Sequence, residues 1–265
     1  MALFACSSDD GGGGGVAVPP NAVVITETNA RDIVQAATVG GAAIIDLIPV
    51  AASAEQAPSA SEIIDLVVDK VKSVSNLPDL NIPVGEIFEI PCDSGNITVN
   101  ATETATSASG TMTFNDCILS GFTLTGTISF SVSFNETTGD WTVAISGNIS
   151  GSDSTITTTL SGLVLNQTGN DNTQEYSINT YTFALDYTGG GGFLVQLLAA
   201  IVGNEAVTCP RSGVILVTGA DNTKAKGTIN GDGTVTIEYD DGSGTFVEVT
   251  EPVPGSPYPC TDFFI

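Results

Sequence analysis

The stretch FTLTGTISFSVSF, from Phe122 to Phe134, decides the fold. Its apolar residues alternate with threonines and serines over the whole length. Successive side chains of a β-strand point to opposite faces, so the pattern predicts an antiparallel strand with one buried and one wet face. The buried face takes Phe122, Leu124, Ile128, Phe130, Val132 and Phe134.

The same alternation recurs on both sides of this stretch, beginning near residue 86. A return strand begins at Trp141, and further strands are expected at 97–104, 110–115, 154–165, 176–187, 213–219, 224–229, 234–239 and 245–250. Turns rich in Asn, Asp and Gly separate them. A spacing of about 10–12 residues favours an antiparallel meander over βαβ units. The segment 189–206 fits a buried strand or a short helix, and its leading glycines favour the helix.

Helical patterns precede the strands, in residues 23–76. Asn29 is a plausible N-cap of a first helix, which Gly40 and Gly41 break or kink. A second helix follows a cap at Ser59 or Ser61 and carries an apolar stripe at helical spacing, formed by Ile63, Leu66, Val67 and Val71.

The expected fold class is α+β, mainly β, with two N-terminal helices packed on a curved or sandwiched antiparallel sheet of about eight to ten strands. Residues 1–22 would hold a signal remnant, a lipidation site and a glycine-rich tether. The helical region 23–83 and the β region 84–265 would form one globular unit.

The charge of the chain excludes several classes of function. Its 265 residues contain 30 acidic and 6 basic residues and no histidine, for a net charge of −24. Nucleic acids and anionic lipid headgroups are bound by basic patches, so neither is an expected partner. The lack of histidine excludes Ser-His-Asp and Cys-His catalysis and His-ligated metals.

Five cysteines point to an oxidising compartment. Cys92, Cys117, Cys209 and Cys260 lie in the β region and form an even set, whereas Cys6 lies alone near the start. Four cysteines allow three pairings. Sequential pairing, Cys92 with Cys117 and Cys209 with Cys260, is favoured because each pair brackets a hairpin-sized segment. Each bond would contribute roughly 3–4 kcal/mol in the chain-entropy model.

The start of the chain, Leu3-Phe4-Ala5-Cys6, resembles the lipobox of bacterial lipoproteins. The resemblance implies cleavage before Cys6 and acylation of that residue. Ser7, rather than Asp, follows the cysteine, which implies the outer membrane. Phe4 is larger than usual, and only five residues precede Cys6, so Met1 is interpreted as a late start or a trimmed end. The Ser/Asp/Gly stretch that follows is typical of a flexible tether.

Lipid is the expected means of membrane attachment. The longest apolar run, Phe193 to Val202, covers ten residues, whereas a membrane-spanning helix needs about 20. A second, weaker resemblance covers about 50 residues from Pro210: a PRSGVILVTGADN strand, then Val235 to Tyr239 and an Asp/Gly turn. It is similar to the tail of uncharacterised proteobacterial β-rich lipoproteins and implies no activity.

Few residues suggest chemistry. Asp232, Asp240 and Asp241 are weak calcium candidates, because Asp is also a common turn residue and the EF-hand spacing is absent. Carboxylates such as Asp140 and Glu175 are numerous enough to pair by chance, so a hydrolase is not favoured. Aromatic residues such as Trp141 and Tyr176 fit sheet packing better than a glycan-stacking patch.

The expected function is therefore that of a non-enzymatic, lipid-anchored cell-envelope protein with a structural or interaction role, no cofactor, and a protein or glycan partner. It would lie at the outer membrane, facing the periplasm or the cell surface. One alternative is a periplasmic carrier of lipid or another apolar ligand in a helix-covered open sheet. Another is a calcium-stabilised surface adhesin.

Overall fold

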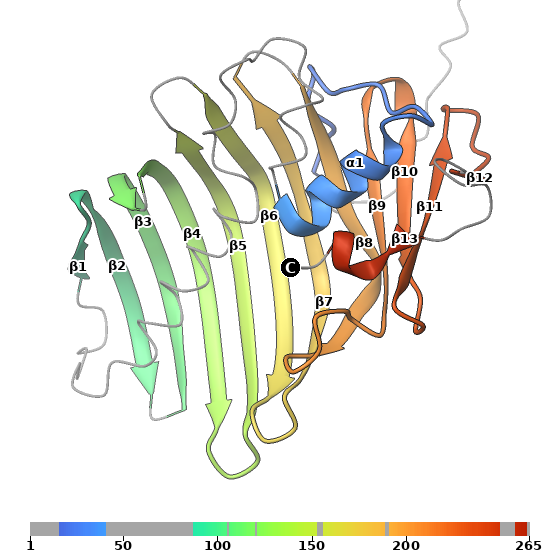
Figure 1. Cartoon of the computed structure of the whole chain (residues 1–265). Helices are drawn as coiled ribbons and strands as arrows, with labels where there is room; N and C mark the ends of the chain where they lie inside the picture. The colour runs from blue at the N-terminus through green and yellow to red at the C-terminus, as the bar shows by residue number, and fades with distance from the viewer. Residues whose placement is uncertain are drawn as a thin grey trace, which may run out of the picture.

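Alternating apolar and hydroxyl residues build a single antiparallel sheet of thirteen strands (Figure 1). The computed structural model describes residues 16–40, 87–104, 106–119, 121–152, 156–188, 191–249 and 258–263. The strands are β1 (Ile87–Pro91), β2 (Ser94–Thr104), β3 (Ser107–Leu119), β4 (Phe122–Asn135), β5 (Asp140–Ser152), β6 (Thr157–Asn170), β7 (Glu175–Tyr187), β8 (Gly192–Asn204), β9 (Ser212–Thr218), β10 (Lys224–Ile229), β11 (Thr234–Asp240), β12 (Val247–Glu248) and β13 (Tyr258–Pro259).

Strands β1 to β12 follow one another in spatial order as they do in sequence, so the sheet is the expected meander. Both β12 and β13 pair with β11, and β1 pairs only with β2 among the described strands. The sheet is therefore open rather than closed. It is one continuous curved layer, which corrects the alternative of a sandwich, and it has more strands than the eight to ten expected.

Strand β4 confirms the pattern that predicted the fold. Leu124, Ile128, Phe130 and Val132 are buried, while Thr127, Ser129 and Ser131 are exposed. At the two ends of the strand the prediction is less exact: Phe122 is partly buried, and Phe134, expected on the buried face, is exposed. Gly126 has φ of +128°, and a Cβ on it would lie 2.4 Å from the carbonyl oxygen of Asn148 in β5. Only glycine accepts this conformation and this approach, which allows the strand to bend.

The described helical elements are few and short. Helix α1 (Ala30–Gln35) continues into a π-helical turn, η1 (Ala36–Gly40), and two 3₁₀ turns follow later, η4 (Ala220–Asn222) and η5 (Cys260–Asp262). Asn29 occupies the N-cap position, as expected, but its side-chain oxygen accepts the N–H of Thr26 instead of capping the helix. The expected second helix and its stripe lie outside the described residues.

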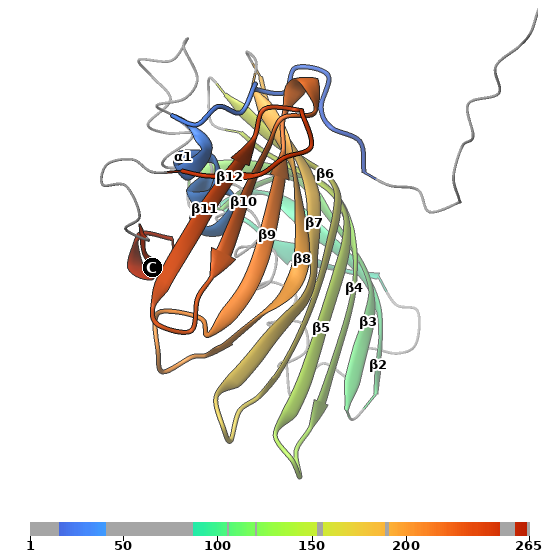
Figure 2. The same ribbon diagram turned by 90° about the vertical axis from the view of Figure 1, so that its right-hand side faces the viewer.

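Helix α1 and η5 lie on the same side of the sheet, which we call the inner face (Figure 2). The helix packs on β9, β10 and β11, with Ile33 and Val34 fully buried. The side chain of Val34 lies where a Cβ on Gly227 of β10 would stand, so the missing side chain allows close contact. The opposite side of the sheet is called the outer face.

The segment 189–206 does not form the favoured helix. It forms β8, in which Phe193 and Val195 are buried on the inner face. Leu194, on the outer face, is also buried, where the N-terminal segment crosses: the N–H of Val23 binds the carbonyl oxygen of Gly192. A strand covered on both sides loses its polar alternation, and this explains the wrong prediction.

Candidate functional site

The outer face of β2 to β7 is a broad surface of hydroxyl and amide side chains, which we call the uncharged face. None of its members is buried. They are Thr98, Asn100, Thr111, Thr113, Thr127, Ser129, Ser131, Ser133, Thr142, Ser146, Asn148, Asn166, Thr168 and Thr180.

The sheet register arranges these side chains in rows across the strands. Thr113 lies opposite Thr127, which in turn lies opposite Asn148. Neighbouring strands are about 4.8 Å apart, so hydroxyls in one row can bond to each other. The hydroxyl oxygens of Thr113 and Thr127 are 3.1 Å apart, and those of Ser133 and Thr142 are 2.7 Å apart. The face is thus an ordered array with part of its hydrogen-bonding capacity used internally.

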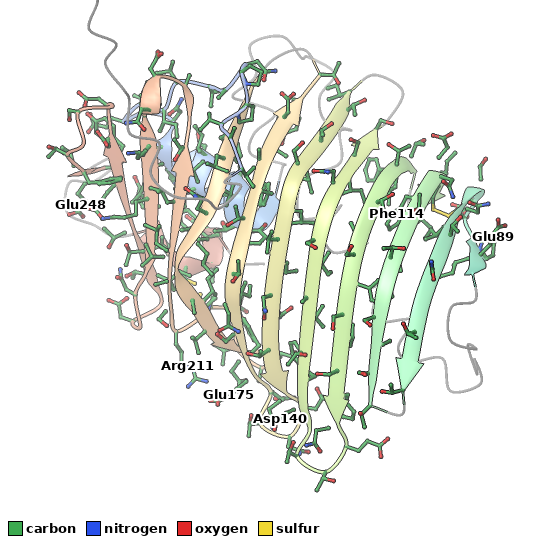
Figure 3. The ribbon with its side chains drawn as sticks, turned by 180° about the vertical axis from the view of Figure 1, so that it is seen from behind. Glu89, Phe114, Asp140, Glu175, Arg211 and Glu248 are labelled. Atoms are coloured by element: carbon green, nitrogen blue, oxygen red, sulfur yellow. A yellow bond between two sulfur atoms is a disulfide. The ribbon has the colours of Figure 1, made fainter. Side chains whose placement is uncertain are left out.

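Charged side chains surround this surface rather than occupy it (Figure 3). Strands β2 to β7 contain five charged residues, each within the first or last four positions of its strand: Glu103, Asp116, Asp140, Glu175 and Asp186. Glu175 begins β7 and pairs with Arg211 at 2.6 Å. In a chain with a net charge of −24, this is the surface where a partner meets the least electrostatic repulsion.

The sequence predicted part of the uncharged face. The hydroxyl side of Phe122 to Phe134 was read correctly, but only the register shows that the hydroxyls of six strands form one surface. Two exposed large apolar residues lie on these six strands, Phe134 at the end of β4 and Val164 of β6. Val164 stands opposite Ser146 and belongs to the same surface.

Two of the predicted cysteine sites are joined and two are adjacent. Cys92 and Cys117 form the expected disulfide, which links the connection after β1 to β3. Cys209 and Cys260 are both thiols, so the second expected disulfide is not formed in this structure, although their side chains are hydrogen-bonded to each other. Burial, followed by this hydrogen bond, raises the pKa of Cys260 to about 12. Cys6 lies outside the described residues.

The calcium candidates do not form one cluster. Asp232 lies in the turn between β10 and β11, and Asp240 and Asp241 lie at the other end of that hairpin. Among the described residues, no three His, Cys, Asp or Glu side chains are arranged to hold a metal.

Each of these carboxylates organises its own turn instead. One oxygen of Asp240 accepts the N–H groups of Gly242 and Gly244 at 3.0 and 2.9 Å. Hydrogen bonds from Ser243 lower the pKa of Asp241. Asp232 accepts the N–H of Thr234 at 3.1 Å. These contacts match the role of Asp as a turn residue.

The candidate hydrolytic carboxylates are likewise engaged in separate contacts. Hydrogen bonds from Thr138 and then Asn170 lower the pKa of Asp140. Glu175 is held in its ion pair with Arg211. Another strand carboxylate, that of Glu238, forms an ion pair with Lys226 at 2.6 Å.

The aromatic residues lie with the core rather than on the outer face. Trp141 and Tyr176 are partly buried and pack against the core cluster. The Trp141 ring lies over Gly169, where a Cβ would stand 2.2 Å from the ring. Tyr187 is buried, and burial raises its pKa. The packing role expected for Trp141 is therefore confirmed.

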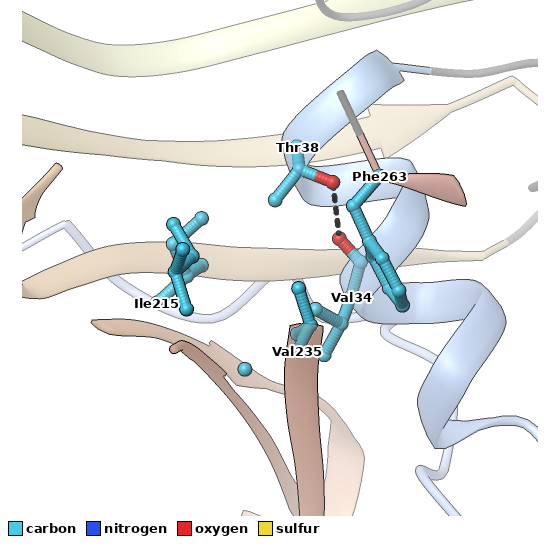
Figure 4. A pocket seen from close by; sticks show the side chains of 7 residues that line it. Val34, Thr38, Ile215, Val235 and Phe263 are labelled. Carbon is cyan, nitrogen blue, oxygen red and sulfur yellow. Dashed lines mark hydrogen bonds between the residues drawn. The ribbon is translucent and has the colours of Figure 1, made fainter. Parts of the chain in front are cut away.

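A closely packed apolar site lies between α1, η1, η5 and strands β9 to β11, and the volume inside it that is open to a water molecule is about 0 Å³ (Figure 4). It is lined by Val34, Thr38, Ile215, Gly227, Ile229, Val235 and Phe263. Ligand pockets usually measure about 300–1,000 Å³, so this site has no space for a lipid. A carrier would be expected to bind its ligand on the apolar face of the Phe122 to Phe134 strand, but none of the residues of that strand lines this site.

Comparison with protein-family models found no match, and no curated protein and no solved structure matched the chain either. Within the described residues, no helix has the length and apolar character needed to cross a membrane.

Proposed function

We propose that the protein is a non-enzymatic, lipid-anchored component of the bacterial cell envelope that binds a partner through its uncharged face. One observation carries the proposal: an exposed array of hydroxyl and amide groups spans six strands, while the 30 acidic residues leave it free of charge. Wet sheet faces in soluble proteins usually mix charges with hydroxyls, so a neutral face in so acidic a chain requires an explanation.

The proposed anchor agrees with the way the chain joins the sheet. Val16 packs over Gly162 of β6, and the chain then bonds to the sheet through the carbonyl oxygens of Asn21 and Val23. Residues 7–15 connect Cys6 to this point, and at about 3.4 Å per residue they span at most about 35 Å. An acylated Cys6 would therefore keep the sheet close to the membrane surface.

The face also defines the chemistry of the partner. A partner with many charges would lose hydration at this surface and find no ion pair in return. A neutral partner rich in hydrogen-bonding groups would exchange bonds to water for bonds to the rows of hydroxyls, at little desolvation cost. We therefore propose an uncharged, polar partner within the envelope.

The anchor is tested by replacing Cys6 with serine in the native host. The wild-type chain should incorporate labelled fatty acid and sediment with membranes, whereas Cys6→Ser should lose the label and become soluble. An unlabelled wild-type chain, or a Cys6→Ser chain that stays with the membranes, would contradict the anchor.

The face is tested with purified Cys6→Ser protein added to isolated envelope fragments. Ser129→Lys places a charge in the centre of the uncharged face and should weaken co-sedimentation by about tenfold or more. Thr261→Lys adds the same charge at an exposed position of η5, on the other side of the sheet, and should leave binding unchanged. Equal binding by the two variants would refute the role of the face.

A further inference from the structure

An open sheet has two edges, and each can add a strand from another molecule. At one edge, β1 is only five residues long and ends at Pro91. Directly after it, Cys92 is bonded to Cys117 of β3, so a covalent link fastens this edge to the third strand.

The other edge is covered by the C-terminal segment, residues 258–263. Tyr258 and Pro259 pair with Val235 and Thr234, the first residues of β11. The N–H of Cys260 then bonds to the carbonyl oxygen of Gly233 at 2.9 Å. The segment thereby occupies backbone groups at the start of β11 that would otherwise be open to another strand.

Non-covalent contacts hold this segment against α1. Asp262 forms an ion pair with Arg31 at 2.8 Å, and its carbonyl oxygen accepts a hydrogen bond from Gln35, also at 2.8 Å. Phe263 is fully buried. The two charged side chains of the ion pair are each more than one-third exposed, so this contact contributes little to holding the segment.

A bond between Cys209 and Cys260 would attach the C-terminal segment covalently to the rest of the sheet. Cys209 belongs to the connection between β8 and β9, which lies at the same end of the sheet as the turn between β10 and β11. Its side chain is hydrogen-bonded to that of Cys260, and Tyr176 lies beside both. Cys260 is fully buried and Cys209 is half-buried.

We propose that Cys209 and Cys260 form a second disulfide in the mature protein, and that this bond locks the C-terminal segment onto the β11 edge. The first disulfide, Cys92–Cys117, guards the opposite edge, so the two bonds together secure both edges of the open sheet. The proposal is independent of the lipid anchor and of the uncharged face.

The oxidation is a thiol–disulfide exchange with an oxidised dithiol oxidoreductase or another small disulfide. The half-buried Cys209 loses its proton and attacks the external disulfide, forming a mixed disulfide and releasing one external thiolate. Cys260 loses its proton in turn and attacks the sulfur of Cys209. The second external thiolate leaves, and the two electrons remain on the reduced external dithiol.

Peptide mapping without reductant tests the bond. Cys6→Ser protein produced in an oxidising compartment is denatured and alkylated with iodoacetamide before digestion. We expect a cross-linked peptide that contains both Cys209 and Cys260, with neither residue alkylated. Alkylation of both, or a link from either to Cys92 or Cys117, would overturn the proposal.

Hydrogen exchange tests the guarding of the edge. In Cys209→Ser, amide exchange in peptides covering residues 233–237 should accelerate by about tenfold or more. Cys92→Ser is the matched control and should accelerate exchange in β1 and β2 instead. The wild-type protein reduced under native conditions gives the same comparison without a substitution. Unchanged exchange at residues 233–237 in both the variant and the reduced protein would refute the guarding role.

Discussion

Replacement of Phe130 by alanine tests the division of the sheet into a buried inner face and a wet outer face. Phe130 lies in the middle of β4 and is 4% exposed. It stands opposite Gly110 in β3 and Ile145 in β5. Gly110 has no side chain to occupy the space that the ring would leave, so the main apolar neighbour in this row is Ile145.

The expected loss follows from the burial of the ring. A phenylalanine side chain buries roughly 150–250 Å², and at about 25 cal/mol per Å² this corresponds to about 4–6 kcal/mol as an upper estimate. Measured truncations of buried aromatic residues cost about 3–5 kcal/mol. We therefore expect Phe130→Ala to lower the free energy of unfolding by about 4 kcal/mol.

Thr127→Ala, three residues earlier on the same strand, is the matched control. Thr127 is exposed on the outer face, where its hydroxyl lies 3.1 Å from that of Thr113. Loss of one solvent-exposed hydrogen bond and of a residue that favours strands should cost well under about 1 kcal/mol.

Urea titrations of the wild-type protein and both variants measure the two losses. The midpoint should shift strongly for Phe130→Ala and slightly for Thr127→Ala, with equal m-values, because the same surface is exposed on unfolding. Equal losses would mean that both faces are covered, and the model of one wet face would be wrong. A mild loss for Phe130→Ala together with a newly bound lipid would favour the apolar-ligand carrier.

Three further predictions concern the C-terminal strands. Asp240→Ala removes the acceptor of two loop N–H groups and should cost about 2 kcal/mol in urea titrations, whereas Asp232→Ala, in an exposed turn, should cost less than about 1 kcal/mol. Equal losses of stability for Asp240→Ala and Asp232→Ala would contradict the role of the Asp240 carboxylate as the acceptor that holds its loop. Lys226→Met leaves the partly buried carboxylate of Glu238 unpaired and should lower the free energy of unfolding by about 1 kcal/mol. The loss should be smaller in 1 M salt, which screens the ion pair of the wild-type protein. A loss that does not depend on salt would argue against the ion pair. In the dithiol form, folding raises the pKa of Cys260 from 9.0 to about 12, so stability should fall as pH rises across this interval. The disulfide form should not show this loss of stability with rising pH. Denaturant titrations of both forms at pH 8 and 10 measure the difference.

The strands that follow the period-two rule were predictable, and the reason is visible in β4 and β11. Each has one face on the core and one in water, so the sequence alternates and the expected bounds differ from the observed ones by one residue. Asn- and Gly-rich turns mark their ends, since these residues readily adopt the tight turns of hairpins. Local sequence therefore carries most of the information on the meander.

The elements that were missed depend on contacts distant in sequence. The first residues of β8, Gly192 to Val195, are buried on both faces, and this part of the strand shows no alternation. Strands β1 and β13 are short and paired on one side, and β13 contains only two residues. Strand β12 was predicted within 245–250, but only two of those residues form it. Such strands form because a partner strand is already in place, and no local pattern specifies them. The uncharged face likewise required the register, because its rows join residues far apart in the chain.

The acidic composition and the neutral face are compatible because they act at different distances. A net charge of −24 repels other copies of the protein before surfaces meet, which protects a large open sheet from association. Many sheets protect their edges with lysines, but this chain has only six basic residues, and its described edges instead have short strands, prolines and cysteines. Since repulsion comes from loops and from the rim of the sheet, the face itself needs no charge to stay soluble. The hydroxyl rows are not needed for solubility, so their residues can serve the binding of a partner. For this reason we place the binding surface on the uncharged face.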